Sequence, residues 1–408
     1  MKAFFVHDNK FWEKDGAVYS YGHFAYDLMW KRYLKHFDEI VVGGRFYEWS
    51  DDECSGLSVT SGDHISFLHL PDLASVAGLK RIHHARKLIR EYEREADFVI
   101  ARLPSQLGSI ACTEAKKLQK NYAVEVVGCA RDAYMNHSLR GRLVAPAMIH
   151  LERKHVRNAP NVIYVSRHFL QERYPNNRFN IGCPDTNIGS TDEDVLNARI
   201  QKIERLDISG VIRIGLVGSL DVKYKGHDTA IRALSILAND FPGLTLNFLG
   251  GGSSCHWEEY AEQFGVANRV VFCGSLPGGK PVMDWLDGID VFIAPSLQET
   301  LGRALIEAMS RACPAIGGAG TAVSEQLPDD CIHNREDAEQ LAQMIAYMLG
   351  HRRYMQLCAE ENFVRSQKYS ESILEERRDY FWRRAAGAIS LKCGGGFDES
   401  EAGHRGLR

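Results

Sequence analysis

The stretch DVFIAPSLQETLGRALIEAM, residues 290–309, joins an apolar strand pattern to an amphipathic helix pattern through a short polar loop. Glu299 follows the strand pattern, Gly302 leads into the helix pattern, and Glu307 lies within the apolar run ALIEAM. In open α/β sheets, ligands bind at the carboxyl ends of the strands, where Glu299 is expected. The first backbone N–H groups of the helix would favour an anion at the same place.

The two glutamates could serve a single ligand. Eight helical positions return to within about 80° of the same face, so both carboxylates can reach one molecule rich in hydroxyl groups, such as a sugar or a ribose. The alternative is a solvated glutamate pair on an ordinary helix. The apolar neighbours of Glu307 count against that alternative, because a buried carboxylate without a partner is costly.

The rest of the chain repeats the alternation of strand and helix patterns. Short apolar runs such as AFFVHD, DFVIARLP and YAVEVVG, and later VIRIGLVGSL and LTLNFLGGG, are separated by longer amphipathic stretches. Continuous apolar strands between helices predict parallel sheets with both faces covered. A chain of 408 residues has room for two such domains. The sequence therefore predicts an α/β protein with two Rossmann-like, doubly wound parallel-sheet domains.

A segment rich in Pro, Asn, Gly and Asp, YPNNRFNIGCPDTNIGSTDED, interrupts the alternation and predicts a boundary between the domains. The Gly-rich, charged end of the chain predicts a flexible tail. We expect an N-terminal domain, a linker, a C-terminal domain, a C-terminal helix that packs back toward the N-terminal domain, and a tail, spanning residues 1–190, 191–210, 211–370, 371–390 and 391–408.

Composition narrows the function and the location. The net charge of −4 gives no global attraction to nucleic acid. The ten cysteines are scattered without a C-x-x-C pair, which predicts buried thiols in a reducing cytoplasm. No run approaches the roughly 18 apolar residues that span a bilayer, and the first residues do not resemble a signal peptide. We therefore expect a cytoplasmic protein whose membrane contact, if any, is peripheral on the inner face.

A second motif, GLVGSLDVKYKGHD, covers residues 215–228. A strand pattern ends in a turn at Gly218, and Lys225 and Gly226 open the next helix pattern. A lysine ammonium beside a helix N-terminus suits a phosphate. The alternatives are a surface lysine and a simple tight turn.

The segments VGSLDVKYKGHD, LNFLGGG, RVVFCGSL, DVFIAPSLQETLGRALIEAMSRACPAIG and AVSEQL occur in this order. As an ordered set they resemble the retaining glycosyltransferases of the GT-B fold, family 4 (glycosyl transferases group 1). The resemblance is dense over about residues 210–330. It implies two Rossmann-like domains that face a cleft, with a nucleotide sugar on the second domain and the acceptor on the first.

The resemblance also implies roles for individual residues. Glu299 looks like the family's glutamate for donor-sugar hydroxyls, Glu307 like its glutamate for ribose hydroxyls, and Lys225 like its diphosphate lysine. Other expected donor-site residues are the loop that embraces the sugar and diphosphate, the turn after the first strand, and the loop that borders the base: Thr300, Leu301, Gly302 and Arg303; Gly218 and Ser219; Gly274, Ser275 and Leu276.

One position departs from the family pattern. The family commonly has an arginine six residues before the diphosphate lysine, where this chain has Ser219. A diphosphate needs charge neutralisation, so the sequence leaves three candidates for the missing cation: Lys223, Arg303, or an arginine of the first domain.

On the acceptor side, the resemblance places Tyr21, Gly22 and His23 at the start of the first helix, facing the cleft. Arg131 and Asp132 follow the strand pattern VEVVG and are our candidates for residues near the reacting centre, with a structural ion pair or turn as the alternative. Many relatives have a histidine just after this strand. Here His137 lies further along, and we assign it no role.

The expected activity is a metal-independent, retaining transfer from a UDP- or GDP-sugar to an acceptor hydroxyl, without a cofactor. A glycan or lipid-linked acceptor of cell-envelope synthesis fits the family. Two basic stretches, residues 80–94 and 140–157, could lie on an anionic membrane, although solvated helix faces explain them as well. The alternatives are a nucleotide-sugar epimerase of the same fold and a non-catalytic nucleotide-sugar-binding protein. The DED sequence at 192–194 resembles a metal motif, but its place in the linker favours a helix N-cap region.

Overall fold

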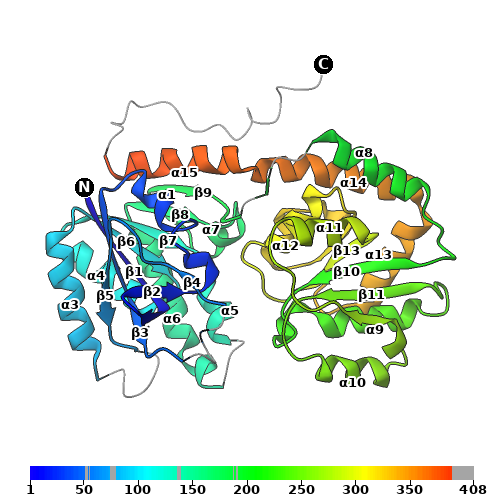
Figure 1. Cartoon of the computed structure of the whole chain (residues 1–408), viewed down its shortest axis with the longest axis horizontal. Coiled ribbons are helices and arrows are strands. Elements are labelled where there is room, and N and C mark those ends of the chain that lie inside the picture. The colour runs from blue at the N-terminus through cyan, green and yellow to red at the C-terminus, as the bar shows by residue number, and fades with distance from the viewer. Residues whose placement is uncertain are drawn as a thin grey trace.

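The computed structural model describes residues 1–50, 54, 56–73, 80–135, 139–186, 188–189 and 192–387, apart from the side chains of residues 139 and 140. Two α/β units lie side by side, each built on its own sheet with helices on both faces (Figure 1). The predicted α/β class with two doubly wound parallel sheets is confirmed.

The N-terminal sheet has nine strands in the described residues, seven of them parallel in the order β5-β3-β1-β6-β7-β8-β9. Their carboxyl ends therefore meet at one edge of the sheet. The parallel strands are β1 (Lys2–Lys14), β3 (Glu39–Tyr47), β5 (Ile65–Leu70), β6 (Phe98–Leu103), β7 (Asn121–Val126), β8 (Asn161–Tyr164) and β9 (Phe179–Gly182).

β1 is longer than the predicted strand AFFVHD because it continues into a hairpin. Asp15 and Gly16 form a two-residue turn with φ of 50° and 78°, the pairing that Asp-Gly favours between antiparallel strands. The turn leads to β2 (Ala17–Ser20), which pairs with β1 and with the two-residue strand β4 (Ser58–Val59). The hairpin is an addition to the strands expected from the sequence.

The stretch FAYDLMWKRYLKHF, residues 24–37, has an amphipathic helix pattern but is only partly helical. Only η1 (Gly22–Phe24) and α1 (Trp30–Leu34) are helical. Phe24 and Trp30 both pack against Phe5 of β1, and the indole N–H of Trp30 donates to Oγ1 of Thr60 at 2.8 Å. Tertiary packing of these aromatic rings thus overrides the local helix pattern.

Helices cover both faces of the N-terminal sheet. Asp8, just beyond the parallel core of β1, accepts hydrogen bonds from the backbone N–H groups of Gln106 and Leu107 at 2.6 and 3.0 Å, and so caps the helix that follows β6. The helices are α3 (Ile82–Glu95), α4 (Gln106–Lys117), α5 (Ala130–Met135), α6 (Leu139–Asn158) and α7 (Phe169–Arg173).

The C-terminal sheet is entirely parallel, in the order β12-β11-β10-β13-β14-β15. Numbered along the chain this is 3-2-1-4-5-6, the Rossmann order, and ligands bind where the order reverses, between β10 and β13. The strands are β10 (Ile212–Val217), β11 (Leu244–Leu249), β12 (Val270–Phe272), β13 (Val291–Ala294), β14 (Ala315–Gly318) and β15 (Ile332–His333). The flanking helices are α9 (His227–Leu237), α10 (Cys255–Gln263), α11 (Lys280–Gly288), α12 (Arg303–Ser310), α13 (Ala338–Gly350) and α14 (Arg352–Ser366).

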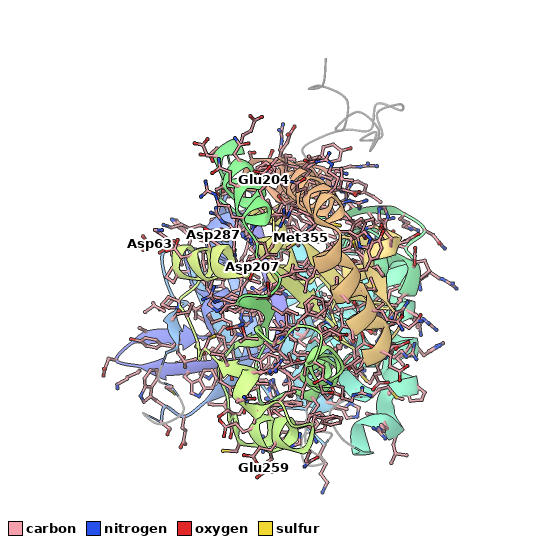
Figure 2. The ribbon with its side chains drawn as sticks, turned by 90° about the vertical axis from the view of Figure 1, so that its right-hand side faces the viewer. Asp63, Glu204, Asp207, Glu259, Asp287 and Met355 are labelled. Atoms are coloured by element: carbon pink, nitrogen blue, oxygen red, sulfur yellow. The ribbon has the colours of Figure 1, made fainter. Side chains whose placement is uncertain are left out.

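The predicted linker at 191–210 contains a helix, α8 (Glu193–Glu204), that belongs to the C-terminal unit. The buried guanidinium of Arg199 donates to the backbone carbonyls of Leu286, Ile289 and Arg311. In Figure 2, Glu204 on α8 lies near Met355 on α14, and these two helices are in contact. Asp192 is the N-cap residue, so DED starts this helix, as expected.

The last described helix, α15 (Glu371–Ala385), runs back over the N-terminal unit (Figure 1). Trp382 packs against the rings of Phe37 and Phe98, and the side-chain amide of Asn121 donates to the backbone carbonyl of Ala385 at 2.8 Å. The two units are therefore tied together at the end opposite α9 and α10. The expected tail, residues 391–408, lies outside the described residues.

All nine cysteines in the described ranges are unpaired, and seven of them are buried. Cys255 is exposed and Cys273 is half-buried, so the expectation of buried thiols is wrong for these two. Cys255 begins α10, where a helix end on the surface leaves its side chain in solvent.

Candidate active site

A cavity of about 640 Å³ lies between the two units, at the carboxyl ends of strands from both sheets. The C-terminal unit contributes the predicted donor-site residues to its wall, except for the three of the base-bordering loop, and most of the side chains from the N-terminal unit were not predicted. The described lining residues are His7, His23, Phe24, Arg102, Val127, Val165, Asp185, Val217, Gly218, Ser219, Lys225, Glu299, Thr300, Leu301, Gly302, Arg303, Ala304 and Glu307.

The loop at residues 299–302 is held in place by the segment after β14. The N–H of Ala322 donates to the carbonyl of Glu299 at 3.0 Å, and the side-chain amide of Gln326 donates to the carbonyl of Leu301. Gly302 has φ of 72° and caps α12, a left-handed conformation that favours glycine. Gly302, Arg303 and Ala304 line the cavity, so the first turn of α12, whose N–H groups have no partner within the helix, lies at the cavity.

Lys225 and Glu299, which both line the cavity, form an ion pair. The Lys225 ammonium donates a hydrogen bond to Oε1 of Glu299, and both side chains are about 20% exposed. Gly226, with φ of 79°, allows the close approach, because a Cβ there would lie 2.3 Å from the carbonyl oxygen of Pro295. The start of α9 is thus locked against the end of β13, which brings the two sequence motifs together.

Glu307 is half-buried on α12 and lines the same cavity. Its carboxylate has no hydrogen-bond partner among the described side chains and backbone groups. Burial raises the pKa of Glu307 above its ordinary value, and the nearby guanidinium of Arg303 partly offsets this effect. A carboxylate held in this way gains free energy when a ligand donates hydrogen bonds to it.

Of the three candidates for the missing cation, the structure brings two into the cavity wall. Ser219 lines the cavity, and so do Arg303 and Arg102. Lys223, in the 3-10 turn η2 (Lys223–Lys225), is not among the described lining residues. Arg303 is exposed at the first turn of α12.

The predicted base-bordering loop follows β12 at the same edge of the sheet. The carbonyl of Gly274 accepts a hydrogen bond from the N–H of Gly250 at 2.8 Å, and a Cβ at Gly250 would lie 2.0 Å from the carbonyl oxygen of Gly218. The loops after β10, β11 and β12 are therefore contiguous. Ser275 approaches Gly251, and Leu276 is 39% exposed. None of the three base-bordering residues is in the described cavity lining.

On the N-terminal side, Arg102 is the central cation. It is 7% exposed at the end of β6, and its guanidinium lies 3.5 Å from Asp185 and 3.9 Å from Glu125. Arg32 also pairs with Asp185 at 2.7 Å. Burial alone would raise the pKa of Asp185, but Arg102 and Arg32 lower it to about 2. The network fixes Arg102 in position, with its guanidinium 5.3 Å from the ring centre of Phe24.

Two histidines also face the cavity. His7 lies in β1 and stacks on Phe24 at 5.9 Å between ring centres, and its Nδ1 is buried without a hydrogen-bond partner in the described chain. Burial, with Arg102 and Arg45, lowers the pKa of His7 well below its ordinary value. Burial lowers the pKa of His23 as well. Both rings are therefore neutral near pH 7.

His7 and Arg102 were missed although the sequence carries a signal for them. Each is a polar residue toward the carboxyl end of an apolar strand pattern, AFFVHD and DFVIARLP, and neighbouring parallel strands bring such ends together. Asp185 had no comparable signal, because it lies in the irregular segment before α8.

The other acceptor-side candidates lie elsewhere. Tyr21 is 43% exposed and packs on Trp12, outside the described lining, and Gly22 lies beside Ser58. Arg131 and Asp132, on α5, do not line the cavity either. Asp132 pairs with Arg173 at 3.3 Å, the structural ion pair that the sequence analysis gave as the alternative. His137 lies outside the described residues.

In the described ranges, no three His, Cys, Asp or Glu side chains cluster as metal ligands would. No helix that the structure describes is long and apolar enough to cross a bilayer.

The chain is similar to known proteins along most of its length. The sequence profile of the family described as Glycosyl transferases group 1 matches residues 212–351. Protein CapJ of Staphylococcus aureus is 31% identical over 377 residues, which cover 90% of each sequence.

Two solved structures share the arrangement of most of the chain. The sucrose-phosphate synthase of Thermosynechococcus elongatus has a TM-score of 0.65 at 16% identity, covering 95% of this chain and all of the other. HepE of Anabaena, in complex with UDP and glucose, has a TM-score of 0.61 at 16% identity, covering 93% of this chain and 98% of the other. At these identities the likeness concerns the fold.

Proposed function

Because the chain belongs to the family of glycosyl transferases group 1 and has the two-domain GT-B fold, we propose that it moves a sugar from a UDP- or GDP-sugar to an acceptor hydroxyl with retention of configuration. Family membership makes it a nucleotide-sugar glycosyltransferase. The observation that carries the finer proposal is the cavity that joins Lys225, Glu299 and Glu307 to the N-terminal wall.

The nucleoside part of the donor would bind at Glu307. A ribose offers two neighbouring hydroxyl donors to a carboxylate that has no hydrogen-bond partner in the described structure. The loop at Gly274, Ser275 and Leu276 would border the base, with the exposed Leu276 side chain as an apolar surface. HepE is a structural relative that binds UDP, so UDP is the first nucleotide to test.

The diphosphate would be neutralised by Lys225, by the N–H groups of the loop and first turn of α12, and by Arg303 in place of the arginine missing at Ser219. Arg303 fits this role better than Arg102, whose charge is already balanced by Asp185 and Glu125. Stabilising the departing diphosphate in this way lowers the barrier without requiring a metal.

Glu299 would hold hydroxyl groups of the donor sugar. In the proposed transfer, the acceptor oxygen forms a bond to the anomeric carbon on the face from which the diphosphate leaves, and the acceptor proton passes to the departing phosphate oxygen. The bond between the anomeric carbon and that oxygen breaks. His23, His7 and Arg102 would form the acceptor side, where neutral imidazoles can hydrogen-bond a hydroxyl group.

A membrane-linked acceptor is the finer part of this proposal. On α3 the basic groups are partly satisfied within the protein, because Arg86 and Arg90 both pair with Glu114. On α6, by contrast, Leu143 and Val144 are 83% and 48% exposed beside Arg142. Exposed apolar residues next to a cation suit an anionic lipid surface. We therefore assign peripheral contact to α6 rather than α3, with a lipid-linked glycan of the cell envelope as acceptor.

Donor turnover without an acceptor tests the catalytic part. UDP or GDP release would be followed for UDP-glucose, UDP-N-acetylglucosamine and GDP-mannose, with wild type, Lys225→Gln and the control Lys223→Gln, each with and without EDTA. Slow release from one donor, abolished in Lys225→Gln but kept in Lys223→Gln and in EDTA, supports the proposal. Release that survives Lys225→Gln contradicts it. Conversion of a donor to its epimer would instead favour an epimerase.

A further inference from the structure

A second cavity, of about 430 Å³, lies on the N-terminal unit between β9, α7 and α15. Figure 1 shows α15 running over this end of the sheet, where β9 is the last strand of the parallel order. Its described lining shares no residue with the cleft and consists of Arg167, His168, Gln171, Phe179, Asn180, Ile181, Gly182, Arg377, Tyr380 and Arg384.

The charged side chains that line this cavity are basic, and the acidic group Glu325 lies behind the wall, where its carboxylate accepts hydrogen bonds from the backbone N–H groups of Arg167 and His168. The cavity is lined by three arginines and one histidine, and its described lining includes no aspartate or glutamate. The chain as a whole has a net charge of −4, so this is a local concentration of positive charge. Arg167 has a buried Nε without a hydrogen-bond partner in the described residues. A buried donor in that state is costly unless a ligand or water satisfies it.

The cations are held in place before any ligand arrives. The guanidinium of Arg384 lies 3.8 Å from the ring centre of Phe179, and that ring also packs against Phe381 at 5.6 Å and Tyr380 at 6.2 Å between ring centres. A guanidinium of Arg377 donates to the carbonyl of Gly182 at 3.2 Å. Fixed guanidinium groups lose little entropy when they bind a carboxylate or phosphate. The side chains of Gln171 and Asn180 also line the cavity, with their amide N–H groups bonded to the backbone carbonyls of Ser166, Arg167 and Arg178.

The second cavity is also close to the cleft along two chain segments. In the first segment, Val165 lines the cleft and Arg167 lines the second cavity. In the other, Asp185 lines the cleft and Gly182 lines the second cavity. Two or three residues of extended chain span roughly 7–10 Å. A short saccharide could therefore reach from the cleft to the second cavity.

We propose that the second cavity binds the acidic group, a carboxylate or a phosphate, of an acceptor glycan whose end reaches the cleft. The acceptor would then be an anionic saccharide rather than a neutral one. That the bound saccharide is an acceptor rests on the proposed transferase function. Binding of an anionic sugar at the second cavity can be tested without transfer.

The test is a saturation-transfer NMR titration with glucuronate, glucose 6-phosphate and glucose, in the presence of saturating UDP to occupy the donor site. The variants are Arg167→Gln/Arg384→Gln, the charge-keeping Arg167→Lys, and the control Arg383→Gln. Arg383 is next to Arg384 on α15 but lies outside the cavity, with Asp379 as its partner at 3.6 Å. UDP affinity and the melting temperature of each variant report on folding and on the donor site separately.

We expect wild type and Arg383→Gln to bind at least one charged sugar and to bind glucose at least about tenfold more weakly, since charge-assisted hydrogen bonds are lost with the neutral sugar. The double glutamine variant should lose the preference, and Arg167→Lys should keep most of it. The response to glucuronate versus glucose 6-phosphate identifies the acidic group. Equal binding of glucose, or unchanged binding by the double variant, overturns the inference. Failure of UDP to bind would count against the proposed function and not against this site.

Discussion

Lys225 and Glu299 form an ion pair in the cleft, although the proposed function assigns one to the diphosphate and the other to the sugar. A donor that enters must therefore separate them and replace each partner. The sugar hydroxyls would then donate to Glu299 while the phosphate oxygens accept from Lys225. The ion pair keeps both groups in position, but breaking it makes donor binding less favourable.

The ion pair predicts opposite effects of one substitution on binding and turnover. In Glu299→Gln, Lys225 loses its carboxylate partner, so UDP should bind as tightly as in wild type or up to about tenfold more tightly. Turnover should fall by at least about a hundredfold, because the sugar loses its charged acceptor. Calorimetry with UDP and a donor-turnover assay measure the two effects. A parallel loss of UDP affinity would show that Glu299 acts on the nucleotide instead.

The missing arginine predicts a rescue. Arg303→Gln should weaken UDP binding by roughly tenfold, the cost of one charge-assisted phosphate contact. Ser219→Arg should tighten it, and the double variant Ser219→Arg/Arg303→Gln should return close to wild type. Calorimetric titration of all four proteins forms a double-mutant cycle. If Arg303→Gln binds UDP as wild type does, Arg303 does not replace the missing cation.

Glu307 predicts a conflict between stability and binding. Its folded-state pKa is raised by burial, so ionisation of this group costs folding free energy above its ordinary pKa. Glu307→Gln should raise the melting temperature of the protein alone at pH 8 by about 1–3 °C and weaken UDP binding. Wild type and Glu307→Gln should also be compared at pH 5.5, where the gain in melting temperature should be smaller. A lower melting temperature at pH 8 would contradict this account of Glu307.

Glu93 predicts how stability depends on pH. Its side chain is fully buried on α3 and both carboxylate oxygens have no hydrogen-bond partner within the described structure. Burial, with Glu114, raises its pKa to about 9 from 4.5. The folded state therefore holds the proton of Glu93 more tightly than the unfolded state does. The stability that this gives the folded state is fully present below pH 4.5, declines as the pH rises and is lost above about pH 9. Each pH unit within that window lowers the free energy of unfolding by up to about 1.4 kcal/mol.

Urea denaturation at pH 5, 7 and 9 checks the Glu93 prediction. Glu93→Gln removes the titrating group, so its stability relative to wild type should increase steadily from pH 5 to pH 9. Glu91→Gln, an exposed position on the same helix, is the matched control. A difference that does not change with pH would show that Glu93 is ionised in the folded protein.

Glu325 links the two units and predicts an effect on turnover without an effect on UDP affinity. Its carboxylate accepts hydrogen bonds from the backbone N–H groups of Arg167, His168 and Phe169 at 2.7–2.9 Å. Glu325→Ala should loosen this contact and lower donor turnover with UDP affinity unchanged, because closing the cleft excludes water and completes the site. Asp329→Ala, exposed nearby, serves as the control. Small-angle scattering would report an increased radius of gyration, and an unchanged radius with normal turnover would contradict the link.

The C-terminal half of the site could be predicted from the sequence because its residues are close together along the chain. Glu299, Gly302 and Glu307 span one strand–loop–helix unit, and Lys225 opens the helix of another, so local patterns and a family resemblance were enough. The roles remain predictions, but the structure brings these four residues to one cavity.

The N-terminal half could not be predicted as well because it depends on contacts that are distant in sequence. The end of a strand pattern marks the position of Arg102, but its orientation beside Phe24 depends on the distant residues Asp185 and Glu125. Asp132 followed the expected strand, yet Arg173, 41 residues later, binds it away from the cavity. Helix α8 has a largely polar composition typical of a linker, and the carbonyl partners that bury its Arg199 are distant in sequence, one in α11 and two just after α11 and α12.

The most direct test of the donor site is calorimetric titration of wild type and Glu307→Ala with UDP, GDP, ADP and CMP. The account predicts that one nucleoside diphosphate, UDP or GDP, binds wild type and binds the variant at least about tenfold more weakly, because two ribose hydrogen bonds to a carboxylate are lost. If no nucleotide binds wild type, or if Glu307→Ala binds it equally well, the two glutamates of residues 299–309 are structural and the donor-site assignment is wrong.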